Sequence, residues 1–357
     1  MSQICNPKSR VLFLLKYRQL YSDVLYTDEV KQPYSYFSSG LLNSASQIVG
    51  MLKENHVETK LVQVIDNNFI DKEVHDYRPT DVIIEALFVV PSKFEILQKL
   101  HPHVRWIIRL HSDAAFASTE GVFTQWLMEY LQYKNLYIGV NSPRMLENLK
   151  SVVPYYKHDK LMFLPNYYSP SKNHIEGVKQ YDDWFNVACP GAIRVLKNQY
   201  LQSVSAIKYA KENDLKLKFH INATRVEGNS DNVLKNIRAL FKALDPQRFQ
   251  LVELPWMTPV DFREYLINMD MVMQVSLNET FNIVSCDAIA VDTPIVVSKE
   301  VPWASRWTTV EDPNDINSIV HGMNVSALLG SVGVCLNKRS LKYYNKHTVK
   351  VWLKEFK

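Results

Sequence analysis

The sequence has few cysteines and no stretch that is long and apolar enough to cross a membrane. Only four cysteines occur in 357 residues, and none of them forms a CxxC pair. This argues against a zinc site or a redox site of the CxxC type. The longest apolar runs, 11–15 and 83–90, fall far short of the about 20 residues that a membrane span needs. The first ten residues lack the apolar core of a signal peptide. We therefore expect reduced thiols and a cytoplasmic protein, in the host cytoplasm if the chain is viral.

Strong net charge and low-complexity segments are also absent. The ten glycines and sixteen prolines are dispersed along the chain, which excludes a flexible low-complexity linker. The net charge of +4 permits an anionic partner but does not demand nucleic acid, whose binders usually carry a basic patch. The basic residues concentrate in 336–357, where lysines mix with Leu341, Tyr344 and Trp352. This pattern predicts an amphipathic closing helix over 338–357, packed on the body of the protein. The alternative is a helix that faces a membrane or a polyanion.

Apolar strand-like runs alternate with helix-length segments along the whole chain. Continuous apolar strands separated by helices indicate parallel sheets that are covered on both faces. The first set of predicted strands is 10–17, 60–66, 81–87, 104–111, 135–141 and 161–166. The second set is 185–191, 215–222, 249–254, 271–276, 294–298 and 332–337.

The predicted architecture is α/β, with two doubly wound Rossmann-like domains. A chain of this length suits two domains, and a polar passage separates the two sets of strands. The predicted boundaries are an N-terminal domain over 1–168, a connection over 169–184, a C-terminal domain over 185–337 and the closing helix over 338–357. In such sheets ligands bind outside the carboxyl ends of the strands, so the residues at those ends are the candidates for function.

Small and basic residues follow two of the predicted strands. Gly40 begins a predicted helix after two serines, and backbone N–H groups at a helix N-terminus can meet a phosphate. A simple serine cap is the alternative. Gly191 ends a strand, and Arg194 and Lys197 follow it. Two cations there would neutralise a diphosphate, although lysine and arginine are more often solvated surface residues.

Acids and a histidine follow other strands. Glu279 and Asp287 are eight residues apart, on either side of a turn that leads into a predicted helix. The two acids can accept hydrogen bonds from sugar and ribose hydroxyls, and a capping Glu with an incidental Asp is the alternative. His111 follows a buried strand, where a structural hydrogen bond is the commoner role. Glu85 and Asn222 lie at the ends of their own strands.

These segments together resemble the retaining, two-domain GT-B glycosyltransferases of the group 1 class, in a divergent, phage-like branch. The second domain of that family carries an acid-x7-acid element in a stretch such as S-x-x-E-G-F-G-x-x-x-x-E-A-x-A-x-G-T-P-V-V. Residues 276–298 read SLNETFNIVSCDAIAVDTPIVVS in the same register. The segments FLPNYYSP (163–170) and NSPRMLENL (141–149) resemble the family's domain-closing strand and one of its N-domain helices.

The resemblance implies two domains facing across a cleft. The N-terminal domain would lie on the acceptor side, and the C-terminal domain would bind a nucleotide-diphosphate (NDP) sugar. The implied reaction transfers a hexosyl or pentosyl group from that donor to an acceptor hydroxyl, with retention of configuration. The implied catalytic residues are Glu279 and His111 at the sugar and Arg194 and Lys197 at the diphosphate. The implied donor-binding residues are Gly40, Gly191, Asn222, Thr280, Phe281, Asn282 and Asp287. Asp287 would bind the ribose, and the backbone N–H groups of 280–282 would face phosphate from a helix N-terminus.

The sequence says less about cofactors and about the acceptor than about the donor. No DxD motif occurs, so we expect no metal and no cofactor besides the NDP-sugar donor. Analogy of fold suggests a hydroxymethylated DNA base as the acceptor, and a glycan, a small molecule or a protein stays open as the alternative. The mild basic excess, which includes Lys93, Lys99, Arg105 and Arg109, would suit a polyanion.

The motif also departs from the family. Asp287 replaces the usual Glu, Thr280 and Asn282 replace glycines, and Asp292 stands in place of the glycine of G-T-P. Two alternatives therefore stay open, a nucleotide-sugar epimerase of the same fold and a catalytically inactive GT-B-like binding protein.

Overall fold

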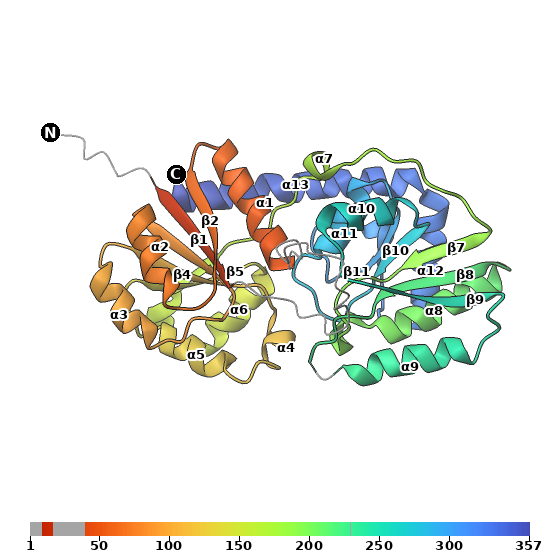
Figure 1. Cartoon of the computed structure of the whole chain (residues 1–357), viewed down its shortest axis with the longest axis horizontal. Helices are drawn as coiled ribbons and strands as arrows, with labels where there is room; N and C mark the ends of the chain where they lie inside the picture. The colour runs from red at the N-terminus through yellow and green to blue at the C-terminus, as the bar shows by residue number, and fades with distance from the viewer. Residues whose placement is uncertain (1–8, 17–39, 229) are drawn as a thin grey trace, which may run out of the picture. The chain divides into compact units, whose positions relative to one another are not determined.

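The computed structural model describes residues 9–16, 40–228 and 230–357. The described chain forms two compact units. The first contains residues 9–16, 40–168 and 345–357, and the second contains residues 169–344. Each unit is built on a parallel six-stranded sheet with helices between successive strands (Figure 1).

The sheet of the first unit has the strand order β2-β1-β3-β4-β5-β6. Its strands are β1 (Arg10–Lys16), β2 (Glu58–Val64), β3 (Asp81–Glu85), β4 (Arg105–Leu110), β5 (Leu136–Val140) and β6 (Leu161–Phe163). Its helices are α1 (Gly40–Glu54), α2 (Phe69–Tyr77), α3 (Lys93–Leu100), α4 (Ala114–Ala117), α5 (Phe123–Tyr130), α6 (Pro143–Val152) and the 3-10 helix η2 (Tyr155–Lys160).

Strand β1 shows why continuous apolar runs predicted this sheet. Successive side chains of a strand point to opposite faces. Leu12 and Leu14 belong to a core that they share with residues of α2, α3, α5 and α6. Val11 and Phe13 belong to a second core with residues of α1 and of the C-terminal end of the chain. Both faces are buried, so every position from 11 to 15 is apolar.

The second unit has the strand order β12-β11-β10-β7-β8-β9. Its strands are β7 (Trp184–Ala188), β8 (Lys216–Asn222), β9 (Phe249–Leu254), β10 (Met271–Gln274), β11 (Ile295–Ser298) and β12 (Thr309–Val310). Its helices are α7 (Pro170–Asn173), η3 (Val195–Lys197), α8 (Gln199–Glu212), α9 (Asp231–Lys242), α10 (Pro259–Ile267), α11 (Ile283–Ala290), η4 (Arg306–Thr308), α12 (Ile316–Leu329) and the first part of α13 (Ser331–Phe356).

The strand order of the second sheet identifies the point where a ligand is expected to bind. The chain starts the second sheet at β7, adds β8 and β9 on one side, and then returns to add β10 on the other. This is the order of a Rossmann sheet, and the crevice opens where the direction reverses, at the carboxyl ends of β7 and β10. The predicted α/β class with two Rossmann-like units is confirmed.

The strand expected over 332–337 is wrong. Residues 331–356 form one helix, α13, which begins directly after Gly330. Gly330 has a φ of +47° and separates α13 from α12. A short apolar run such as VGVCL has no period that distinguishes a strand from a buried helix. The closing helix thus begins seven residues before the expected position, at 331 instead of 338.

No single helix in the described residues is long and apolar enough to cross a membrane. Helices α12 and α13, which meet at a bend of 100°, meet that test only as a pair, by length and composition.

Candidate functional site at the reversal point of the second sheet

A glycine turn follows β7. Gly191 has a φ of +118°, and a Cβ at this position would meet nothing within 4 Å, so backbone conformation rather than space requires glycine. Its N–H donates to Oδ1 of Asn222 over 2.8 Å. Nδ2 of Asn222 donates to the carbonyl of Pro255 over 3.1 Å. Asn222 is buried at the end of β8, and its observed role is to fix the shape of the glycine turn.

Three buried glutamines hold the loop after that turn. Gln199 donates to the carbonyl of Ala192 over 2.9 Å, and Gln202 donates to the carbonyl of Lys197 over 2.7 Å. Gln274, the last residue of β10, donates to the carbonyl of Pro190 over 2.8 Å. Each glutamine is at most 2% exposed. Buried side-chain amides with bonded partners fix one loop conformation, because each unmade bond would leave a desolvated group unpaired.

Lys197 and Glu279 meet at the reversal point. Nζ of Lys197 donates to Oε2 of Glu279, and the two side chains are 18% and 14% exposed. Nδ2 of Asn282 donates to the same Oε2 over 3.0 Å and to Oε1 of Gln274 over 2.9 Å. Lys197 follows β7 and Glu279 follows β10, so the structure brings together two of the predicted catalytic residues.

The helix after Glu279 begins later than the sequence analysis expected. Helix α11 starts at Ile283, because Asn282 has a φ of +63° and serves as its N-cap. Oδ1 of Asn282 accepts the N–H of Ser285 over 2.9 Å. The expectation that Thr280 and Phe281 present helix N-terminal N–H groups is therefore wrong, and Asn282 alone of the three lies at the helix terminus. Thr280 and Phe281 precede the helix and are buried, and the carbonyl of Phe281 accepts the indole N–H of Trp303.

Arg194 has a carboxylate partner that the sequence analysis missed. Nε of Arg194 donates to Oε2 of Glu227 over 2.6 Å, and Arg225 pairs with the other oxygen of the same carboxylate. Burial alone would raise the pKa of Glu227, but the charges of Arg194 and Arg225 outweigh it and lower that pKa. Glu227 is therefore ionised at neutral pH. Arg194, Lys197 and Arg225 against Glu227 and Glu279 leave one net positive charge near the glycine turn.

Asp287 lies in a buried ion pair. Its side chain is 5% exposed, and its Oδ1 lies 3.4 Å from Nη1 of Arg263. Arg263 comes from α10, and its Nε has no hydrogen-bond partner among the described residues. Charged side chains are seldom buried unless they are paired. The sequence offered no signal for this pair, because the two residues are 24 positions apart on different helices.

His111 belongs to a buried charge network in the first unit. Its Nε2 bonds to Oε2 of Glu85, and both oxygens of Glu85 lie 3.1 Å from Nη1 of Arg109. Arg109 also donates to Asn166. Burial opposes ionisation of Glu85, but the adjacent Arg109 keeps the pKa of Glu85 below its usual value. Burial lowers the pKa of His111, so its imidazole is neutral at pH 7.

The charge states fix the tautomer of His111. An ionised carboxylate only accepts hydrogen bonds, so Nε2 of His111 carries the hydrogen that bonds to Glu85. Nδ1 of the neutral ring is then a hydrogen-bond acceptor.

Two other expectations concern the first unit. Gly40 is the exposed first residue of α1, and a Cβ there would meet nothing within 4 Å, so no close approach requires glycine. The two serines before it lie outside the described residues. Two residues of the expected basic excess do not present a free charge to a polyanion, because Arg109 is fully buried and Arg105 pairs with Asp81 and Glu355.

Possible metal ligands do not cluster in the part of the chain that the structure describes. No group of three or more His, Cys, Asp or Glu side chains there is placed to hold a metal ion.

Comparison with known proteins gives a structural likeness only. No family model matches the chain, and no curated protein matches it in sequence. A solved apo structure of OtsA has a TM-score of 0.66 and 11% identity, and the match covers 98% of this chain and 99% of that one. A trehalose-6-phosphate protein from E. coli bound with UDP-2-fluoro glucose has a TM-score of 0.63 and 11% identity, and covers 97% and 98%. A UDP-forming trehalose-phosphate synthase from Burkholderia xenovorans has a TM-score of 0.61 and 10% identity, and covers 98% of each chain. The chain therefore has the GT-B fold of two Rossmann-like domains.

Proposed function

We propose that this protein transfers a sugar from a nucleotide-diphosphate donor to an acceptor hydroxyl, with retention of configuration. The carrying observation is the Lys197–Glu279 pair, which stands with the Gly191 turn at the reversal point of a Rossmann sheet. Ligands of such sheets bind at this point. One structural neighbour is named as a UDP-forming synthase, and another is bound with UDP-2-fluoro glucose, which supports the same donor class.

The proposed donor site lies along the loop from Gly191 to Lys197. The left-handed glycine lets backbone approach a diphosphate, and Lys197 and Arg194 supply charge for it. Glu279 is proposed to accept hydrogen bonds from sugar hydroxyls, since Asn282 and Lys197 already fix its carboxylate. Before the donor binds, the ion pair keeps the charges of Lys197 and Glu279 paired. Donor binding would then replace part of this contact with contacts to the ligand.

The other predicted residues also have proposed roles, and their observed contacts limit what each can do. Asp287 would reach a ribose only if its pair with Arg263 adjusts, because both side chains are buried. His111 keeps the role that the resemblance implies, at the donor sugar, with its ring held by Glu85. Asn282 acts by orienting Glu279 and capping α11. Asn222 acts by fixing the glycine turn. Thr280, Phe281 and Gly40 stay in the proposal as backbone positions only.

The proposed chemical step breaks the bond between C1 of the sugar and the phosphate oxygen. The bonding electron pair leaves with the nucleoside diphosphate, and the acceptor oxygen attacks C1 on the same face. The acceptor proton passes to the departing phosphate oxygen. Lys197 and Arg194 would stabilise the charge that grows on the diphosphate, and preorganised donors of this kind are worth about 3 kcal/mol each.

Ligand-induced stabilisation tests the proposal directly. A panel of nucleotides and NDP-sugars should reveal one donor that raises the melting temperature, because ligand at about 100 times Kd stabilises the native state by about 2.7 kcal/mol. Glu279→Gln should abolish the sugar-specific part of the shift and keep the shift with the bare nucleotide. Glu264→Gln, on the exposed surface of α10, is the control and should behave like the wild type.

The same panel separates the alternatives. Conversion of the donor without any acceptor would identify an epimerase. A selective shift with no turnover on glycan or hydroxymethylated DNA acceptors would identify a binding protein. The absence of a shift with every NDP-sugar would reject the donor site.

A further inference from the structure

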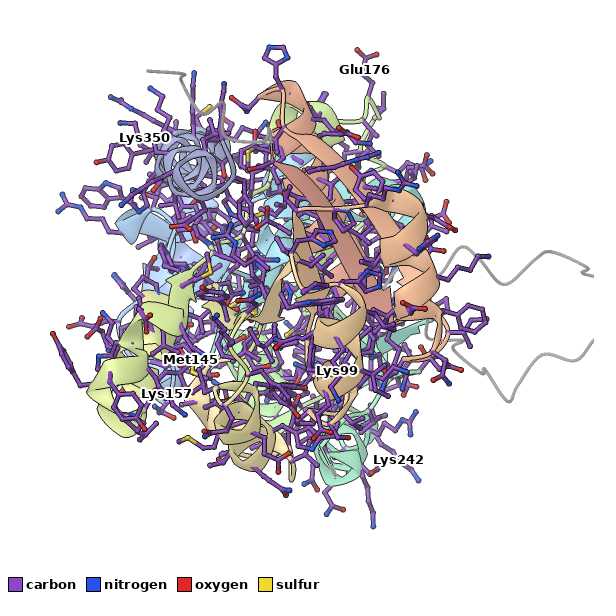
Figure 2. The ribbon with its side chains drawn as sticks, turned by 90° about the vertical axis from the view of Figure 1, so that its left-hand side faces the viewer. Lys99, Met145, Lys157, Glu176, Lys242 and Lys350 are labelled. Carbon is purple, nitrogen blue, oxygen red and sulfur yellow. The ribbon has the colours of Figure 1, made fainter. Side chains whose placement is uncertain are left out.

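The outer side of α13 carries a continuous basic face. We define it as Arg339, Lys342, Lys346, Lys350, Lys354 and, directly after the helix, Lys357. All six are exposed, and Figure 2 labels Lys350 among the side chains that project from this helix. At about 100° per residue, the six positions fall within an arc of about 120°. The opposite side is buried, and its apolar side chains Leu341, Trp352 and Phe356 are at most 1% exposed.

No carboxylate on α13 balances this basic face. The helix contains one acid, Glu355, which lies about 160° around the helix from Arg339. Glu355 is already paired with Arg105, with 3.6 Å between Nη1 and Oε2. Exposed helices commonly alternate acids and bases so that neighbours four residues apart attract. Here Lys342, Lys346, Lys350 and Lys354 repeat every four residues, which places like charges next to each other three times.

This arrangement weakens the isolated helix and adds nothing to its packing. Like charges four residues apart destabilise a helix, and the buried residues on the opposite side already hold α13 in place. A row of uncompensated cations is useful when an anionic surface neutralises it. The face therefore has the charge of a polyanion-binding element.

We propose that the basic face of α13 binds the phosphate backbone of nucleic acid without reading its sequence. Positions 339 to 357 span about 27 Å at 1.5 Å per residue, which matches about eight base pairs of duplex at 3.4 Å each. A helix that lies on a membrane also presents Trp, Phe or Leu for insertion. Tyr343, 79% exposed, is the one large hydrophobic residue described as exposed between 333 and 357. The geometry thus favours nucleic acid over a bilayer, and this inference does not depend on the sugar-transfer proposal.

Salt-dependent binding of a fluorescein-labelled 20-bp DNA duplex of random sequence, measured by anisotropy, tests the inference. If about five cations each neutralise one phosphate, the binding constant falls with a log–log slope of about −4.5. Raising KCl from 50 to 200 mM should then weaken binding about 500-fold. An unlabelled duplex of different sequence should compete equally.

The decisive variant is Lys346→Glu with Lys350→Glu. Its slope should drop to about −2.7, and its affinity at 50 mM KCl should fall at least tenfold. The new acids would stand four residues from Lys342 and Lys354, so attraction replaces repulsion in two of the three neighbouring pairs and the helix should remain folded. The control is Lys235→Glu with Lys242→Glu on α9, where both lysines are exposed and the net charge changes equally. The control should lose less than threefold.

Four results would overturn the inference. The wild type does not bind the duplex, or the α13 variant keeps the wild-type slope. The α9 control loses as much affinity as the α13 variant, which would indicate net charge alone. Finally, the α13 variant loses binding to phosphatidylserine vesicles while it keeps its affinity for DNA, which would assign the face to a membrane surface.

Discussion

Removal of the Arg109 charge should strongly destabilise the first unit. Arg109 and Glu85 are both fully buried, with two Nη1–oxygen distances of 3.1 Å. Arg109→Met keeps most of the side-chain volume but leaves the Glu85 carboxylate without its main counter-charge. Breaking a buried pair from one side costs about 3–5 kcal/mol. The matched control is Arg10→Met, whose exposed pair with Glu58 should contribute at most about 1 kcal/mol.

Hydrogen exchange measures this loss within one unit of a two-domain protein. Peptides from β3 and β4 report the opening free energy of that sheet. A loss of 3–5 kcal/mol should speed their exchange roughly 150- to 5,000-fold, while peptides from β7 and β8 serve as the internal reference. Replacing both charges, with Glu85→Leu and Arg109→Met, should recover much of the protection, because no unpaired charge then remains.

Two results would refute this reasoning. Equal protection losses in Arg109→Met and Arg10→Met would mean that the network is hydrated rather than buried. A double variant as unprotected as the single variant would mean that Arg109 acts through its bonds to Asn166 and the Leu164 carbonyl, and not through the charge of Glu85.

Three further predictions concern the second unit. Lys197→Ala should lower turnover about a hundredfold, or about 3 kcal/mol in the barrier, and wild-type turnover would remove its assignment. Gly191→Ala should cost about 1–3 kcal/mol of unfolding free energy because of its φ of +118°. Gly50→Ala within α1 should stabilise by about 0.5–1 kcal/mol, and the same sign in both would contradict the backbone argument. Burial lowers the pKa of His220 to about 4, below the unfolded value of about 6.5, so its stabilisation is present above pH 6.5 and is lost as pH falls to 4. Urea unfolding at both pH values should show wild type losing about 3 kcal/mol more than His220→Gln, and parallel losses would disprove the link.

The sheets were predictable because strands that are buried on both faces appear in the sequence as continuous apolar runs. β1 reads as an unbroken apolar run over 11–15, and Gly40 began a helix as expected. The same logic failed over 332–337, where a run of five apolar or small residues fits a buried helix equally well. The local sequence could not distinguish a helix from a strand over 332–337, since the outcome depends on Gly330 and on the residues that bury the helix.

The site was predictable at the level of residue type and strand end, but not of pairing. Lys197 and Glu279 could be named because each follows a strand that adjoins the reversal point. Glu227 also follows a strand, β8, and the same rule could have found it. Gln202 and Gln274 carried no such signal, since glutamine is ordinarily a surface residue. Their burial follows from loops that only the folded chain brings together.

The chain path of α13 has a consequence for synthesis. The described residues of the second unit all lie within 169–344, whereas the first unit needs residues 345–357 as well. Trp352 and Phe356 pack in the same core as Phe13 and Ile48. On the ribosome the second unit can therefore complete its core first, while the earlier-made unit waits with part of its apolar interior uncovered. This reverses the usual N-terminal-first order, so a chain that is truncated shortly after residue 344 should contain one finished unit, and it should be the second.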